Sequence, residues 1–213
     1  CLEVEMANIE VVHPQQITEP LAASERGGNG CGHVFTIGHS NHSLDAFVYL
    51  LLANRIQVLV DVRSQPASSH VPQFNAQHLK AALGRVGVRY LPLGKELGGR
   101  PKEPEFYDAQ GFVLYDVLAK SSAFLKGIQR LRDGIQRFRI ALMCSEEDPN
   151  VCHRRLLIGR VLTQQGVALS HIRGDGTVDP ESSLSQQEQR RVQSPQIEMF
   201  ALHPKLKFPR DIA

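Results

Sequence analysis

The sequence lacks the marks of a membrane or secreted protein. No apolar run approaches the roughly 20 residues that cross a bilayer, and we find no secretory pattern of basic head, apolar middle and small-residue cleavage site. Cysteines are few, with four among 213 residues at positions 1, 31, 144 and 152, which is not the pattern of a secreted disulfide framework. We therefore expect reduced thiols in a cytoplasmic protein that has no membrane partner.

An excess of charge of one sign is also lacking. The 24 basic and 22 acidic side chains leave a formal net charge of +2, too small to indicate a nucleic-acid binder through bulk electrostatics. Any anion-binding site must therefore be local. The composition is 42% apolar and 22% charged, which is ordinary globular usage, and the length fits one domain with appendages.

Short apolar runs alternate with helical periodicity through the middle of the chain. Strands are predicted at 34–37, 58–62, 88–93, 139–144 and 167–172, with helical patterns between them. Because fully covered strands of a parallel sheet are unbroken apolar runs, we predict an α/β fold, a mostly parallel sheet with helices on both faces.

We expect a single domain with extended termini. Residues 1–32 form a largely irregular N-terminal extension in which only 9–13 resembles a strand that would add to a sheet edge. Residues 33–178 form the α/β domain, and residues 179–213 form a C-terminal tail that is either helical or extended.

The loop from Cys144 to Arg155 is the most informative segment, because ligands of such sheets bind beyond the carboxyl ends of the strands. Asp148 followed by Pro149 predicts a helix N-cap that places Cys152 in the first helical turn. A helix N-terminus favours a thiolate or a bound phosphate there. In the alternative interpretation Cys152 is a small core residue on the apolar stripe of that helix. Cys144, at the end of a buried strand, is predicted to be structural.

Two thiols and His153 also raise the question of a metal. Seven residues separate Cys144 from Cys152, whereas structural zinc sites usually space paired ligands by two to four. A fourth ligand is not evident, although His39 would converge with them if its strand were a neighbour. We predict no cofactor and no metal, and we keep a thiol or metal protein using Cys144, Cys152 and His153 as a third interpretation.

Two other strand ends carry ionisable residues. Gly38 lets the backbone approach a ligand closely, and His39 offers a base near neutral pH. Asp61 is costly to bury without a partner, and Arg63 has the geometry to clamp a phosphate. The alternatives are a tight turn with a capping histidine and an ion pair that only pins its loop.

Weaker signals come from a glycine-rich segment and an acidic run. Gly98 and Gly99 lie in the segment 94–100, which lacks both the P-loop order and the dinucleotide fingerprint. It predicts either a loop that folds over a site or a flexible connection. Glu146 begins an acidic run that is either solvated or supplies an acid or base.

Four groups of motifs occur together in order along the chain. They are Thr36–Ser40; Leu59–Arg63 with Pro66 and Ser68; Tyr90 with Leu97–Gly99; and Leu142–Glu146 with Asp148, Pro149 and Cys152–Arg154. In this combination the sequence resembles family 488 of the domains of unknown function, over residues 34–172. The resemblance implies an α/β domain with these loops as its signature, and it implies no particular reaction, substrate or cofactor. The positions that match its motifs are Gly38, His39, Ser40, Asp61, Arg63, Pro66, Ser68, Gly98, Gly99, Cys144, Glu146, Cys152, His153 and Arg154.

Ionisable residues gathered at several strand ends favour an enzyme, because such groups cost stability unless they are satisfied. We predict a hydrolase or transferase acting on an anionic substrate, a phosphate-bearing nucleotide or nucleic-acid-like molecule, at the carboxyl edge of the sheet. The predicted catalytic residues are His39, Asp61, Glu146 and Cys152. The predicted substrate-binding residues are Gly38, Ser40, Arg63, Ser68, Gly98, Gly99, His153 and Arg154.

A non-catalytic alternative stays open beside the thiol or metal protein. A module that binds nucleic acid or a nucleotide-bearing partner would be aided by the basic tail from Arg190 to Arg210, and its affinity would fall steeply with salt. Ser40, Ser68 and Ser145 are nucleophile candidates wherever a base lies within hydrogen-bond reach. The sequence does not define the oligomeric state.

Overall fold

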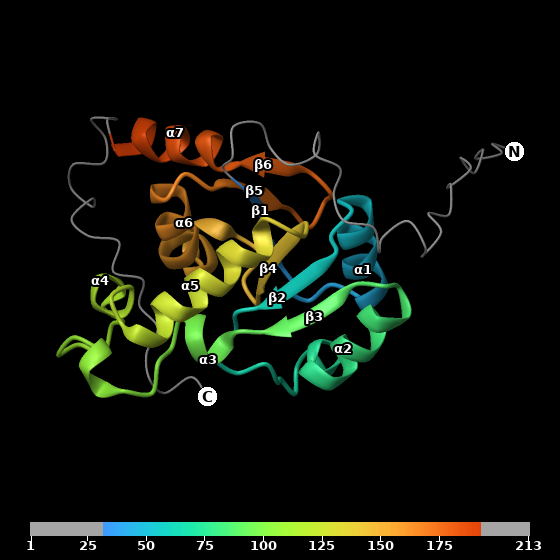
Figure 1. Cartoon of the computed structure of the whole chain (residues 1–213), viewed down its shortest axis with the longest axis horizontal. Coiled ribbons are helices and arrows are strands. Elements are labelled where there is room, and N and C mark those ends of the chain that lie inside the picture. The colour runs from blue at the N-terminus through green and yellow to red at the C-terminus, as the bar shows by residue number, and fades with distance from the viewer. Residues whose placement is uncertain (1–31, 193–213) are drawn as a thin grey trace, which may run out of the picture.

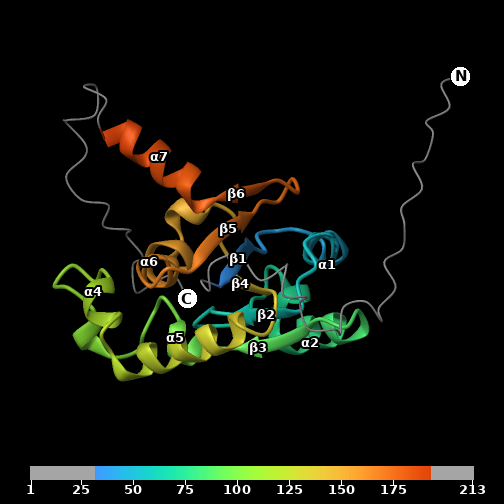
Figure 2. The same cartoon turned by 45° about the horizontal axis from the view of Figure 1, so that its top comes forward.

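The computed structural model describes residues 32–192 (Figures 1 and 2). The strand predicted at 9–13, the rest of the N-terminal extension and the basic tail beyond residue 192 lie outside this range. Among the described residues, no helix combines the length and apolarity needed to cross a bilayer.

A six-stranded sheet with the order β3-β2-β4-β1-β5-β6 lies at the centre (Figure 1). The first five strands run parallel and β6 is antiparallel to β5. The predicted α/β class with a mostly parallel sheet is therefore confirmed. The strands are β1 (His33–Gly38), β2 (Val58–Asp61), β3 (Arg89–Pro92), β4 (Ile140–Cys144), β5 (Ala168–Ile172) and β6 (Val178–Pro180).

Helices cover both faces of the sheet. On one face pack α1 (Leu44–Ala53) and α2 (Ala76–Arg85), and on the other pack α5 (Ser122–Ile135) and the π-helical segment η5 (Arg154–Gly159), which leads into α6 (Arg160–Gln164). The remaining helices are α3 (Gly94–Leu97), α4 (Tyr115–Leu118) and α7 (Glu181–Val192), with 3-10 turns η2 (Pro72–Phe74), η3 (Pro104–Phe106) and η4 (Pro149–Val151).

The central strands are unbroken apolar runs because both of their faces are buried. In β4, Leu142 packs on the α5 and α6 side, whereas its neighbours Ala141 and Met143 pack on the α1 and α2 side. Side chains of a strand alternate between faces. Cys144 therefore points to the α5 and α6 side. The helix that follows the loop after Cys144 packs on the same side.

The chain leaves the neighbouring strands β1 and β4 in opposite directions. From β1 it passes through α1 to β2, on the far side of β4, and from β4 it passes through η5 and α6 to β5, on the far side of β1. These two connections cover opposite faces of the sheet. In such sheets a crevice opens at this switch of direction, beyond the carboxyl ends of the strands.

The loop after β4 differs from the prediction in one respect. Asp148 acts as an N-cap, but its side chain accepts from Asn150 N at the start of the short turn η4. Cys152 follows with extended dihedrals (φ −118°, ψ 137°), and its carbonyl accepts the first helical N–H groups, from Arg155 and Leu156. The prediction that Cys152 lies inside the first helical turn is thus wrong, because the cap serves a separate 3-10 turn.

The segment predicted as a C-terminal tail begins with ordered structure. Strand β6 extends the sheet next to β5, and α7 follows it directly (Figure 2). Leu184 of α7 is buried. Strand β6 and the first part of α7, up to Glu188, therefore pack on the domain.

Candidate active site

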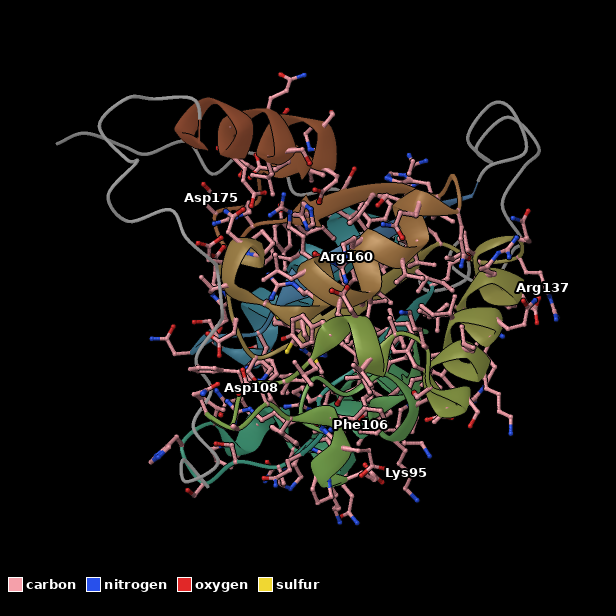
Figure 3. All side chains as sticks on the ribbon, turned by 90° about the vertical axis from the view of Figure 1, so that its left-hand side faces the viewer. Lys95, Phe106, Asp108, Arg137, Arg160 and Asp175 are labelled. Atoms are coloured by element: carbon pink, nitrogen blue, oxygen red, sulfur yellow. The ribbon has the colours of Figure 1, made fainter. Side chains whose placement is uncertain are left out.

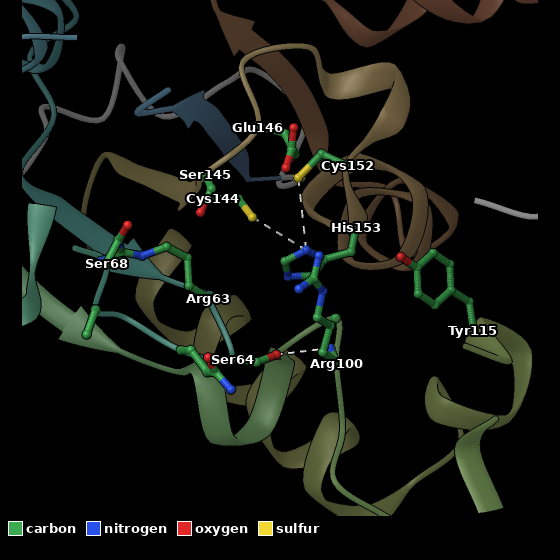
Figure 4. A pocket seen from close by; sticks show the side chains of 13 residues that line it. Arg63, Ser64, Ser68, Arg100, Tyr115, Cys144, Ser145, Glu146, Cys152 and His153 are labelled. Atoms are coloured by element: carbon green, nitrogen blue, oxygen red, sulfur yellow. Dashed lines mark hydrogen bonds between the residues drawn. The ribbon is translucent and has the colours of Figure 1, made fainter. Parts of the chain in front are cut away.

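A pocket of about 270 Å³ opens beyond the carboxyl ends of β2 and β4 (Figure 4). Its walls come from the loops after these two strands, from the start of the helix after Cys152, from the segment after α3 and from α4. The lining residues are Arg63, Ser64, Gln65, Ala67, Ser68, Gly99, Arg100, Tyr115, Cys144, Ser145, Glu146, Cys152 and His153.

The imidazole of His153 lies next to two thiols, and its hydrogen bonds define its tautomer. Its Nε2 lies 3.1 Å from the carbonyl oxygen of Val62, which only accepts, so Nε2 carries the proton. Its Nδ1 therefore presents a lone pair, 3.6 Å from Cys144 Sγ and 3.9 Å from Cys152 Sγ (Figure 4). The ring is thus oriented to accept a proton from a thiol, or to ligate a metal together with the two sulfurs.

The two thiols have different electrostatic surroundings. The hydrogen bond from Cys152 lowers the pKa of Cys144 against the opposing effect of burial, with help from Arg154 and the backbone N–H groups of Ser145 and Glu146. Burial raises the pKa of Cys152 to about 12, and its hydrogen bond with Cys144 acts in the same direction. Of the two, Cys144 is the thiol that the surroundings favour as a thiolate.

Buried hydrogen-bond partners hold the side chain of Arg63 at the edge of the pocket. Asp61 accepts from its Nε at 2.9 Å and from its Nη2 at 2.6 Å, and both side chains are buried. Tyr90 donates its hydroxyl to the same carboxylate. Nη2 also donates to the carbonyl of Phe74, and Nη1 donates to His39. The guanidinium is therefore fixed before any ligand arrives.

His39 and Asp61, two of the predicted catalytic residues, are placed behind this wall. His39 donates from Nδ1 to the carbonyl of Ser40, accepts from Arg63 at Nε2 and stacks on Phe74. Burial lowers the pKa of His39 to about 4. Both its nitrogens and both oxygens of Asp61 are occupied, so the geometry makes them positioning residues for Arg63.

Arg154, predicted to bind substrate, is fully buried and supports the loop after β4 from inside. Its guanidinium donates to the carbonyls of Glu146 and Glu147 and to the hydroxyl of Thr36. These partners are uncharged, so the positive charge acts on the surrounding groups, Cys144 among them. Arg154 does not line the pocket.

The predicted glycines permit close approaches of the backbone. A side chain at Gly38 would collide with the backbone of Glu146, and one at Gly98 with the carbonyl of Gly94. A Cβ at Gly99 would lie 2.5 Å from Cγ of His153, so this glycine lets the segment after α3 pack on the imidazole. The interpretation of this segment as a loop that folds over a site agrees with this contact.

The predicted site residues divide into two equal groups. Those that line the pocket are Arg63, Ser68, Gly99, Glu146, Cys152 and His153. Those that lie outside its lining and support its walls or loops are Gly38, His39, Ser40, Asp61, Gly98 and Arg154. Ser40 belongs to the second group because its N–H donates to the carbonyl of Ser145.

Sequence reasoning missed several lining residues. Three of them are sequence neighbours of predicted positions: Ser64, Gln65 and Arg100. The Oγ of Ser64 accepts a hydrogen bond from the backbone N–H of Arg100. Tyr115 is part of an apolar pattern with helical spacing, which predicts a core residue and not a site residue. Burial raises the pKa of its hydroxyl. Figure 4 shows Tyr115 on the side of His153 away from Arg63.

A second cavity, of about 850 Å³, has different chemistry. It lies between α4, α6 and α7, and Asp108 and Arg160, labelled in Figure 3, are among its lining residues. Apolar side chains such as Val117 and Val151 and ion-paired Arg155 form much of the rest. Tyr115 lines both cavities, but the thiols and His153 line only the first.

The fold and the pocket define a doubly wound α/β protein with a thiol and imidazole centre at the carboxyl ends of β2 and β4, next to the switch point between β4 and β1. The chain belongs to the family described as Domain of unknown function DUF488, whose model matches residues 43–161, more than half of the chain. This confirms the family predicted from the motifs, while the loop after β1 lies outside the matched range. A comparison with curated proteins and one with solved structures each gave no match.

Proposed function

We propose that this protein is an enzyme, a hydrolase or transferase, that acts on an anionic, phosphate-bearing substrate in the pocket at the ends of β2 and β4. One observation carries the proposal: the cluster of Cys144, Cys152 and His153 lines the same pocket as Arg63 and Arg100. Reactive groups and cationic groups thus face one shared space.

The cationic side of the pocket suits a phosphate. The partners of Arg63 take four of its five N–H groups, which leaves one for a ligand, and Arg100 adds a second guanidinium at an exposed position. Hydroxyls of Ser64 and Ser68 line the same space. Guanidinium and hydroxyl donors match phosphate oxygens, and a nucleotide is a substrate with this chemistry.

The thiol and imidazole side favours an enzyme over a binding module. Recognition of an anion needs donors and positive charge, but it does not need two buried thiols beside an oriented imidazole lone pair. Such a group supplies either a nucleophile or metal ligands. Free thiols at Cys144 and Cys152 fit a reducing, cytoplasmic setting, which is part of the proposal.

Binding and turnover test the proposal separately. Inorganic phosphate and nucleoside monophosphates should bind the full chain in titration calorimetry. Arg100→Gln should weaken binding about tenfold, the effect of losing one charge-assisted hydrogen bond of about 1.5 kcal/mol. Arg132→Gln, at an exposed position on α5, is the matched control and should bind as the wild type does.

Turnover distinguishes the enzyme from a module. Phosphorus NMR of a panel of phosphate esters and nucleotides should show conversion by the wild type. Cys144→Ser should bind the same compounds but convert none of them. Conversion by Cys144→Ser at the wild-type rate would refute the assigned centre, and binding without any conversion by the wild type would identify a binding module.

A further inference from the structure

We propose that Cys144, Cys152 and His153 bind one zinc ion whose fourth coordination position opens into the pocket. The inference deepens the proposed function, on which its catalytic meaning rests, but the binding of the ion is testable without it. The ligand atoms of the three residues lie within 4.8 Å of one another, and all three side chains are buried. All three also line the pocket.

The separations between the ligand atoms fit a tetrahedral ion. Zinc lies about 2.3 Å from thiolate sulfur and about 2.1 Å from imidazole nitrogen, so tetrahedral angles separate sulfur from nitrogen by about 3.6 Å. Nδ1 of His153 lies 3.6 Å from Cys144 Sγ and 3.9 Å from Cys152 Sγ. Both separations from Nδ1 thus match a tetrahedral ion to within a few tenths of an ångström, and the two sulfurs lie within 4.8 Å of each other.

His153 has the surroundings of a metal ligand. Its Nε2 donates to the carbonyl of Val62 at 3.1 Å, which leaves Nδ1 unprotonated toward the sulfurs. Histidines that ligate metals almost always donate the other ring N–H to a carbonyl or carboxylate in this way. Gly99 packs against the ring and helps to fix its plane.

The sulfur ligands are also supported. The backbone N–H groups of Ser145 and Glu146 interact with Cys144, and hydrogen bonds to ligating sulfurs are a common feature of metal–thiolate sites. Both thiols are buried, so two bare thiolates would be costly there. One divalent ion balances the charge of two thiolates and removes that cost.

The ligand set selects the metal and the kind of site. Two thiolates and an imidazole are soft or borderline ligands, which suit zinc and disfavour magnesium and calcium. Among the described residues the cluster has three members. Three protein ligands with an open position are typical of catalytic zinc, as four are of structural zinc. Water or a substrate oxygen would complete the tetrahedron from the pocket.

The structure also explains why the ligand spacing is unlike that of a zinc knuckle. The turn η4 follows Asp148, and Cys152 leaves it in an extended conformation, with its sulfur within 4.8 Å of that of Cys144 at the end of β4. The short spacing of knuckles allows a single tight turn to supply two ligands. Here a longer loop, held from inside by Arg154, brings the two sulfurs to one nitrogen.

Metal content of the full chain tests the proposal. After loading with zinc and dialysis, elemental analysis should find one zinc per chain in the wild type and in Cys1→Ser/Cys31→Ser, which removes the other two thiols. Cys152→Ser and His153→Gln should each lose the stoichiometric zinc. Retention of one zinc by both single variants, or its absence from the loaded wild type, would overturn the proposal.

A second measurement keeps the test valid if a variant fails to fold. In the wild type, zinc should protect Cys144 and Cys152 from an alkylating reagent, as mapped by mass spectrometry, and should raise Tm. Alkylation of both thiols at the same rate with and without zinc would also overturn the site. Absence of zinc with intact phosphate turnover would leave the proposed function standing, whereas zinc binding without phosphate binding would refute that function alone.

Discussion

The ion pair between Asp61 and Arg63 is the residue-scale contact on which the cationic wall depends. Asp61 is 1% exposed and Arg63 is 5% exposed. Burying either charge alone would cost several kcal/mol, and the two hydrogen bonds between them, with the added donor from Tyr90, offset that cost. The pair therefore holds Arg63 at the pocket.

Asp61→Asn should be strongly destabilising for this reason. It keeps the shape of the side chain but leaves the buried guanidinium of Arg63 without a counter-charge, which should lower the free energy of unfolding by about 3–5 kcal/mol in urea denaturation at pH 7. Asp116→Asn is the control. Asp116 pairs with Arg160 at 2.7 Å, but the two side chains are 82% and 44% exposed, so its loss should cost less than about 1 kcal/mol. Equally small decreases in the free energy of unfolding of both variants would contradict this role of the pair between Asp61 and Arg63.

At this scale the sequence pointed to many of the residues that line the pocket, but not to the contacts that they make. The motifs contained Cys144, Cys152 and His153, and all three reach the pocket. Which thiol is favoured as a thiolate depends on the backbone N–H groups after β4, which residue spacing does not define. Likewise, His39 is a base by residue type, but the contacts of its two nitrogens became visible only in the structure.

At the scale of elements, Glu181 joins α7 to the domain, beside the buried Leu184 and beside Glu188, which accepts from Arg155 at 3.2 Å. Glu181 accepts from Arg155 at 2.9 Å and from His171 Nε2 at 2.8 Å, and Ser185 donates to it from the next turn. His171 is fully buried and contacts Thr36 through its other nitrogen. The helix is thereby linked to β5 and, through Arg155, to the helix that begins at the candidate site.

This attachment should weaken in acid. Hydrogen bonds that Glu181 accepts from His171, Arg155 and Ser185 hold its pKa at about 2, against the opposing effect of burial. Because the pKa is depressed from 4.5 on folding, its stabilisation is complete above pH 4.5 and is lost as the pH falls toward 2. Hydrogen exchange of α7 should therefore accelerate in that window in the wild type.

Glu181→Gln provides the comparison for this pH dependence. The variant should exchange α7 amides faster at pH 7 and lack the additional acceleration that protonation of Glu181 causes in the wild type between pH 4.5 and 2. Burial also lowers the pKa of His171, so its contribution declines as the pH falls below 6.5 in both proteins, and the difference between their profiles reports Glu181. Identical pH profiles of wild type and variant below pH 4.5 would contradict the role of Glu181.

Elements with strong apolar periodicity were predictable, and weak ones were not. The strand predicted at 88–93 is found as Arg89–Pro92, and the one at 139–144 as Ile140–Cys144. Helix α7 is rich in polar residues and was predicted only as part of a tail that is either helical or extended. Its packing on the domain depends on a contact between Arg155 and Glu181. The hydrophobic periodicity of a helix does not show which residue elsewhere in the chain such a carboxylate will bind.

At the scale of the whole molecule, strand order determines which loops meet. Insertion of β4 between β1 and β2 places the Cys144 loop beside the loop that carries Arg63, and together they form the pocket. The sequence predicted that ligands bind at the carboxyl edge, which is where the pocket lies. It did not define the strand order, so it could not show that His39 would end behind Arg63.

A crystal structure of the full chain soaked with zinc and inorganic phosphate would show whether the ion and the anion share this pocket. We expect an anomalous zinc peak at bonding distance from Cys144 Sγ, Cys152 Sγ and His153 Nδ1. We also expect a phosphate in the pocket that Arg63 and Arg100 line, with one oxygen toward the ion. Zinc and phosphate bound elsewhere on the domain, with this pocket filled only by water, would contradict this expectation.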